Sequence, residues 1–280
     1  MAKTARRRAP FYFRKKPKPQ HDIRLLRPPT LPLGQRFETS EDVREYSVAS
    51  EQKLDLSTRR EDQRLADRLH ECRTSSQRCD LPSCPICARL FRIWFIGELL
   101  RIVEDIGSAP VHIVTILVNE ASCDQIDRLK VKAYDATLRK RLSRNGLGDV
   151  AVIGGYENVY RARSKTWVLH INLLILGGTS EAINRFRATF SNSNIANPFK
   201  HQKLNDLPEQ LSYPLKFTTY HRPFAQRGST KSLPIPLNPR EHCALVAWMA
   251  QWTFQNFMFL FNARREGARI VSGSWSTLTF

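Results

Sequence analysis

Residues 166–178, Thr-Trp-Val-Leu-His-Ile-Asn-Leu-Leu-Ile-Leu-Gly-Gly, decide which fold the sequence predicts. Apolar side chains at every second position from Trp167 to Ile175 predict a β-strand with one core face, because successive side chains of a strand point to opposite sides. His170 and Asn172 share the other face, where an imidazole nitrogen and an amide oxygen could hold a divalent cation or bind a phosphate. The simpler interpretation of these two residues alone is a core histidine beside a hydrogen-bonded asparagine.

A second strand is expected over residues 150–160, just before the first in the chain. Only five residues connect the two strands, so we expect a hairpin. With its turn centred between Arg163 and Ser164, equal counting along both arms places Glu157 opposite His170. A carboxylate, an imidazole and the nearby amide oxygen together suit Mg²⁺ or Mn²⁺, so the hairpin carries a candidate divalent-metal site.

A cysteine cluster precedes the hairpin. Four cysteines lie within sixteen residues, and the last two form a Cys-Pro-Ile-Cys turn that presents two sulfurs to one ion. We expect a zinc ion here, with a reduced, metal-free cluster as the alternative, and His70 as a spare ligand leaves the choice of four open. Four protein ligands leave no open coordination position, so the zinc is expected to be structural rather than catalytic. The four residues are Cys72, Cys79, Cys84 and Cys87.

Residues 243–261 contain no charged side chain over nineteen positions. The length suits a membrane span, but Gln251, Gln255 and Asn256 would place amides in the middle of the bilayer at a high free-energy cost. We therefore predict a buried helix that closes the domain, and no membrane partner. Apolar spacing and charge predict the other elements: helices over residues 41–70, 88–103, 124–145 and 181–190 and a strand over residues 111–118.

The charge balance points to a polyanionic partner. The 280-residue chain has 44 Lys and Arg against 26 Asp and Glu, a net charge of +18, and an isoelectric point near 10.1. A field of this sign concentrates phosphates, which favours nucleic acid over an anionic membrane and is far from what a small neutral substrate needs. Residues 1–20 hold eight Lys or Arg and no acid, as expected of a basic arm that follows a nucleic-acid backbone or only keeps the chain soluble. Six cysteines without an apolar N-terminal segment indicate a reducing cytoplasm.

Tyr213-Pro-Leu-Lys216 is a candidate nucleophile motif. If the segment is helical, Tyr213 and Lys216 share one face, and the ammonium can stabilise a phenolate or a phosphate near the hydroxyl. Pro214 would place the tyrosine at the start of such a helix. A Tyr-x-x-Lys motif is also common by chance, and Tyr220 with His221 is a competing candidate nearby.

The order of these features resembles that of the rolling-circle replication initiators of plasmids and phages, members of the HUH endonuclease superfamily, over residues 72–220. The shared order is a cysteine cluster with a basic helix, a Thr-bearing strand, a strand with Glu157, a strand with His170 and Asn172, and a Tyr-x-x-Lys motif. In this chain Asn172 replaces the second histidine of the usual pair, and an amide is a weaker metal ligand than an imidazole.

The resemblance implies that His170, Asn172 and Glu157 hold a divalent metal, Mg²⁺ or Mn²⁺, which polarises a scissile phosphate. Tyr213, assisted by Lys216, would attack the phosphate and leave a 5′-phosphotyrosine and a free 3′-hydroxyl. Such an enzyme is a DNA-nicking endonuclease and strand transferase that starts rolling-circle replication in the bacterial cytoplasm. Its partners would be single-stranded DNA, a replication origin and host replication proteins.

We therefore expect an α+β fold with a central, mainly antiparallel sheet flanked by helices, like that of replication initiators, and an N-terminal zinc knuckle. The alternative function is that of a non-catalytic, zinc-containing DNA-binding protein with the same fold. The expected units are a basic, Pro-rich arm (1–40), a helical segment with the knuckle (41–105), an HUH-like catalytic core (106–225) and a helical closure (226–280).

Overall fold

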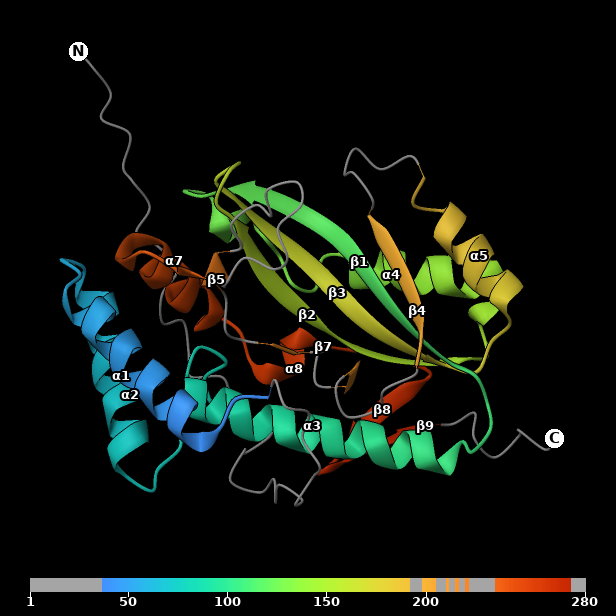
Figure 1. The fold of residues 1–280 in the computed structure, drawn as a ribbon, viewed down its shortest axis with the longest axis horizontal. Helices are drawn as coiled ribbons and strands as arrows, with labels where there is room; N and C mark the ends of the chain where they lie inside the picture. The colour runs from blue at the N-terminus through green and yellow to red at the C-terminus, as the bar shows by residue number, and fades with distance from the viewer. Residues whose placement is uncertain are drawn as a thin grey trace, which may run out of the picture.

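A long antiparallel hairpin forms the centre of the sheet (Figure 1). The computed structural model describes residues 37–191, 198–204, 210–211, 215–216, 220–221 and 235–272. The main part of the sheet has the strand order β4-β1-β3-β2-β7, with every pair antiparallel. Its strands are β1 (Val111–Ser122), β2 (Ala151–Arg161), β3 (Thr166–Leu176), β4 (Phe199–Lys203) and β7 (Met258–Phe261). The predicted α+β architecture with an antiparallel sheet flanked by helices is confirmed.

Two short strands extend the sheet where β2 ends. β5 (Tyr220–His221) pairs in parallel with β2 through His221 and Tyr160, and β6 (Ile235–Pro236) pairs with β5. Since β7 occupies the other end of the same edge, β2 is bordered by two different segments along its length.

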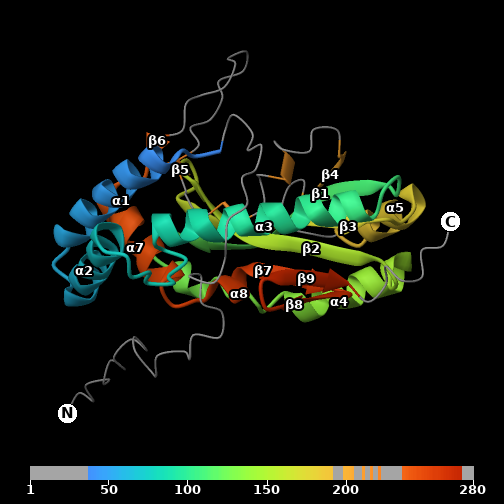
Figure 2. The ribbon, with the colours of Figure 1, turned by 90° about the horizontal axis from the view of Figure 1, so that it is seen from below.

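The helix α3 (Pro85–Asp105) runs alongside the sheet (Figures 1 and 2). Pro85 stands at its first turn, where the missing N–H costs nothing. Phe91 stacks on Phe254 with ring centroids 4.5 Å apart, and Trp94 Nε1 donates to the carbonyl of Ala268 at 2.7 Å. These contacts join α3 to α8 (Phe254–Phe257) and to the hairpin of β8 (Ala263–Glu266) and β9 (Arg269–Ser272), and the predicted helix over residues 88–103 is confirmed.

The helices α4 and α5 pack on the sheet face opposite His170; α4 lies below the sheet in Figure 2. Tyr156 points to that face and donates its hydroxyl to Asp135 Oδ1 at 2.6 Å, where α4 begins. Phe186 of α5 packs edge-on against Phe199 of β4, with centroids 5.6 Å apart. The bounds are Ile126–Arg128 for the 3₁₀ helix η2, Asp135–Leu142 for α4, Ser143–Leu147 for the π-helical turn η3 and Ser180–Ala188 for α5.

The single helix predicted over residues 124–145 is wrong in its first half. The chain forms a short 3₁₀ turn and then an irregular stretch before α4 begins at Asp135. The carbonyl of Leu129 accepts a hydrogen bond from Trp248 Nε1 at 3.0 Å, so it is used by tertiary packing rather than by a helical N–H. Apolar spacing alone does not distinguish such a buried turn from helix.

A helical bundle stands at the end of the molecule where β5 lies (Figure 1). It consists of α1 (Ser40–Asp55), α2 (Arg60–Thr74) and α7 (Pro239–Met249). Capping boxes begin α1 and α7, at Thr39 and Asn238. The helices predicted within residues 41–70 are confirmed as two helices rather than one.

The buried helix predicted over residues 243–261 is wrong beyond Met249. A new capping box at Thr253 begins α8, and residues 258–261 then form β7, which pairs with β2. The apolar run is explained by burial in a helix and in a sheet, not by one helix, and the last strand of the core sheet comes from the segment expected to be a helical closure. No helix in the described part of the chain is long and apolar enough to cross a membrane.

Candidate functional site

Glu157 and His170 face each other across the central hairpin. The register pairs them directly, as the sequence predicted, and His170 Nε2 lies 2.8 Å from Glu157 Oε2. Both residues are 8% exposed. The register follows from the short connection, in which Arg161 still pairs with Thr166, so the arms are of equal length. A buried carboxylate and imidazole are therefore held together on stiff strands.

Asn172 lies on the same face of β3 as His170, as predicted, and its neighbour is Thr115 of β1. The Thr115 hydroxyl donates to Asn172 Oδ1 at 2.7 Å. Sequence reasoning placed a threonine in this strand but gave it no role, because no tight turn fixes the register of β1 against β3. The amide oxygen that was predicted to bind a cation therefore accepts a hydrogen bond from a hydroxyl group.

Leu215 and Lys216 lie against this face of the sheet, beside Gly155 and Glu157. The Lys216 main-chain N–H donates to Glu157 Oε1 at 3.0 Å, and the Leu215 side chain is fully buried. Leu215 has φ +64°, a left-handed conformation that a helix does not contain. The helix expected to place Tyr213 and Lys216 on one face is therefore wrong at this point, and it is the Lys216 main chain that contacts Glu157.

The structure does not describe the side chain of either candidate nucleophile. Tyr213 lies outside the described residues. The backbone of Tyr220 forms β5 and pairs with Pro236, while its side chain lies outside the described part of the chain.

The two ring nitrogens of His170 have different surroundings. Nδ1 is buried and has no hydrogen-bond partner among the described residues, whereas Nε2 faces Glu157. The 2.8 Å spacing between Nε2 and Oε2 is that of a hydrogen bond, so the pair can share a proton. Asn172 Oδ1 is bonded to Thr115 of β1, whereas Glu157 is on β2, at the opposite edge of β3.

The four cysteines form the second candidate site. Their sulfur atoms all lie within 4.8 Å of one another, with Cys72 Sγ 3.6 Å from Cys87 Sγ and from Cys84 Sγ, and Cys79 Sγ 3.7 Å from Cys87 Sγ. Zinc–sulfur bonds of about 2.3 Å in a tetrahedron place the sulfurs about 3.8 Å apart, so the cluster can hold a metal such as zinc. His70 is not part of it, because its Nδ1 lies 3.2 Å from Glu51 Oε2.

The cysteine cluster joins two helices. Cys72 belongs to the last turns of α2, while Cys84 caps α3 and Cys87 lies in its first turn. Hydrogen bonds from Cys79 and the other thiols lower the pKa of Cys72, whereas hydrogen bonds from Cys72 together with burial raise the pKa of Cys84 and Cys87. A bound cation would have to displace the protons of the last two thiols.

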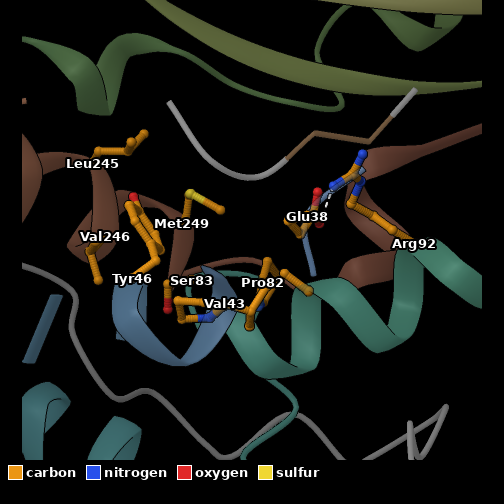
Figure 3. Close-up of a pocket in the computed structure, with 11 residues that line it drawn as sticks. Glu38, Val43, Tyr46, Pro82, Ser83, Arg92, Leu245, Val246 and Met249 are labelled. Atoms are coloured by element: carbon orange, nitrogen blue, oxygen red, sulfur yellow. Dashed lines mark hydrogen bonds and ion pairs between the residues drawn. The ribbon is translucent and has the colours of Figure 1, made fainter. Parts of the chain in front are cut away.

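The pocket shown in Figure 3 is a poor candidate for a substrate site. It lies between α1, the cysteine loop, α3 and α7, and its lining is mostly apolar. Arg92 at one end already forms an ion pair with Glu38. Its volume of about 20 Å³ has room for about one water molecule.

Comparisons with protein-family models, with curated proteins and with solved structures found no match to this chain.

Proposed function

We propose that this protein nicks and rejoins single-stranded DNA as the initiator of rolling-circle replication of a plasmid or phage. The observation that carries the proposal is the buried Glu157–His170 pair on adjacent strands, with Asn172 on the same face. Phosphoryl transfer needs a cationic clamp on the phosphate, a placed nucleophile and a basic surface for the strand.

Each residue has a role in this proposal. His170, Glu157 and Asn172 would hold a divalent ion, Mg²⁺ or Mn²⁺, which would stabilise negative charge on the scissile phosphate. The Tyr213 oxygen would form a bond to phosphorus while the bond from phosphorus to the 3′-oxygen breaks. The tyrosine proton would pass to that 3′-oxygen, and Lys216 would stabilise the charge that develops between them.

Tyr213 is proposed as the nucleophile because it lies two residues before Leu215 in the sequence. Leu215 itself packs against β2 at Gly155. The net charge of +18 supports a polyanionic substrate. Single-stranded DNA at a replication origin, host replication proteins and the bacterial cytoplasm belong to the same proposal.

A second candidate function is that of a non-catalytic, zinc-containing DNA-binding protein with this fold. The observation that favours it is the hydrogen bond from the Thr115 hydroxyl to Asn172 Oδ1, because this bond occupies an oxygen that the metal would need. Low exposure of Glu157 and His170 favours it as well.

The deciding experiment looks for a covalent protein–DNA adduct. The protein is incubated with Mn²⁺ and a pool of single-stranded DNA that includes the element's own origin, and the products are separated on a denaturing gel. We expect an adduct that falls more than about 1000-fold in Tyr213→Phe and in His170→Ala, because each removes a member of one catalytic unit. Tyr46→Phe, a tyrosine of α1 away from the sheet, is the matched control and should keep the adduct.

The other outcomes assign the function differently. An adduct that survives Tyr213→Phe and is lost in Tyr220→Phe would move the nucleophile. Tight DNA binding by the wild-type protein without any adduct would reject the nuclease and support the second candidate.

A further inference from the structure

A glycine of β2, Gly155, leaves the space that the Leu215 side chain occupies. Gly155 lies two residues before Glu157 and therefore on the same face of the sheet. A Cβ atom at position 155 would stand 2.3 Å from Leu215 Cδ2 and 2.5 Å from Leu215 Cγ. Real Cβ contacts are not this short, and the Leu215 side chain is 0% exposed with nowhere to retreat. Only glycine lets this leucine reach the sheet in the observed position.

The leucine is held at a cost to its backbone. A non-glycine residue in the left-handed region, here with φ +64°, is strained and persists only where the surrounding structure holds it there. Burial of the Leu215 side chain offsets part of that cost. Packing of a leucine by itself requires neither this backbone nor a glycine beneath it.

A buried carboxylate completes the arrangement. Glu157 Oε1 accepts the Lys216 N–H at 3.0 Å, while Glu157 Oε2 lies 2.8 Å from His170 Nε2. One side chain thus connects the residue after Leu215 directly to the histidine of the candidate site. The connection is short and rigid, since Glu157 and His170 are on paired strands.

We propose that Gly155, Leu215 and Glu157 form an anchor that fixes the chain segment bearing Lys216 at a set position over His170. The three are positioning residues: Gly155 admits Leu215, and Glu157 ties the main chain beyond it to the histidine. The consequence for strand transfer rests on the proposed function, but the anchor itself does not.

The anchor is tested first by hydrogen exchange of the Lys216 amide, followed by NMR in protein labelled with ¹⁵N-lysine. The signal is assigned by its loss in Lys216→Arg. We expect a protected amide in the wild type and at least about ten-fold faster exchange in Gly155→Ala, in Leu215→Ala and in Glu157→Ala. Leu211→Ala, a fully buried leucine in the same part of the chain, and Gly148→Ala, where a Cβ meets nothing closer than 3.7 Å, are the matched controls.

Two variants separate the anchor from general damage to the fold. Glu157→Gln keeps an oxygen for the Lys216 N–H and a donor for His170 Nε2, so protection should remain within about two-fold of wild type. Gly155→Ala combined with Leu215→Ala should exchange no more than about two-fold faster than the faster of the two single variants, because both changes remove the same contact. Independent effects that multiply in the double variant, or a Lys216 amide that exchanges at the unprotected rate in the wild type, would overturn the anchor.

The role in strand transfer is tested on the same variants by the rate of adduct formation. A positioning role predicts that Gly155→Ala lowers kcat at least about ten-fold with KM unchanged, and that adding Leu215→Ala to it lowers kcat no further. If the anchor is lost in Gly155→Ala while kcat stays at the wild-type value, the positioning role is rejected and the anchor stands. If wild-type protein forms no adduct, the proposed function fails, and the amide exchange still decides the anchor.

Discussion

His242 is a buried side chain that is expected to make stability depend on pH. The residue is 2% exposed, and its Nε2 lies 2.8 Å from Ser50 Oγ in the contact between α1 and α7. Burial, with a smaller contribution from the charge of Lys53, lowers the pKa of His242 to about 4. The unfolded chain has an ordinary histidine with a pKa near 6.5, so below that pH unfolding takes up a proton that the folded state does not bind.

We expect the free energy of unfolding to fall by about 2 kcal/mol between pH 7 and pH 5 because of His242 alone. The contribution of His242 to the free energy of unfolding is fully present above pH 6.5 and is lost as the pH falls towards 4. Urea denaturation of wild type and His242→Gln across this range measures the difference between the two slopes. Equal slopes for wild type and His242→Gln would contradict the expectation.

At the scale of residues, sequence reasoning found the part of the site that local rules determine. Glu157 could be matched with His170 because a short turn fixes the register of a hairpin. The contact of the Lys216 main chain with Glu157 could not be found in the same way. It depends on a left-handed leucine that fits a glycine 60 residues earlier, and no local pattern encodes that pairing.

The elements joined by the cysteine cluster are α2 and α3. The loop between them, from Ser75 to Ser83, is mostly irregular. A metal at four thiolates would hold the end of one helix and the start of the next together, and α3 in turn runs alongside the sheet (Figure 1). Binding energy at such a site is folding energy.

We expect the purified protein to contain about one zinc ion per chain, measured by mass spectrometry of the metal content. Cys84→Ser should lose the metal and lower the free energy of unfolding on the order of 3 kcal/mol, because Cys84 is fully buried and is one of the four expected ligands. Cys123→Ser, a cysteine outside the cluster, should retain metal and stability. Equal metal contents for the two variants would show that the cluster is not the site.

Elements were predictable where one period dominated the sequence, and ambiguous where a run was apolar throughout. The alternation in β3 and the helical spacing in α3 each fit a single structure. Residues 243–261 fit either, and what decided between helix and strand was the free edge of β2, which accepts β7. That edge exists only once the sheet has formed, so residues 243–261 alone do not determine where helix ends and strand begins.

The described part of the molecule has two ends, a helical bundle and a sheet, with α3 running alongside the sheet (Figure 1). A net charge of +18 over 280 residues produces attraction to phosphate whether or not the Glu157–His170 pair is catalytic. Binding and chemistry must therefore be measured separately.

We expect affinity for single-stranded DNA to fall steeply with salt. If about five phosphates are contacted, each contributes about −0.7 to the slope of log K against log salt, so raising salt from 50 to 200 mM should weaken binding about 100-fold. Fluorescence anisotropy with a labelled oligonucleotide measures the slope, and an uncharged-backbone oligomer of the same sequence should give almost none. His170→Ala should keep the wild-type slope, because it removes a buried group rather than a phosphate contact. A slope near zero for DNA would refute the electrostatic argument, whereas a slope that collapses in His170→Ala would mean that the histidine contributes to binding the strand and not only to its cleavage.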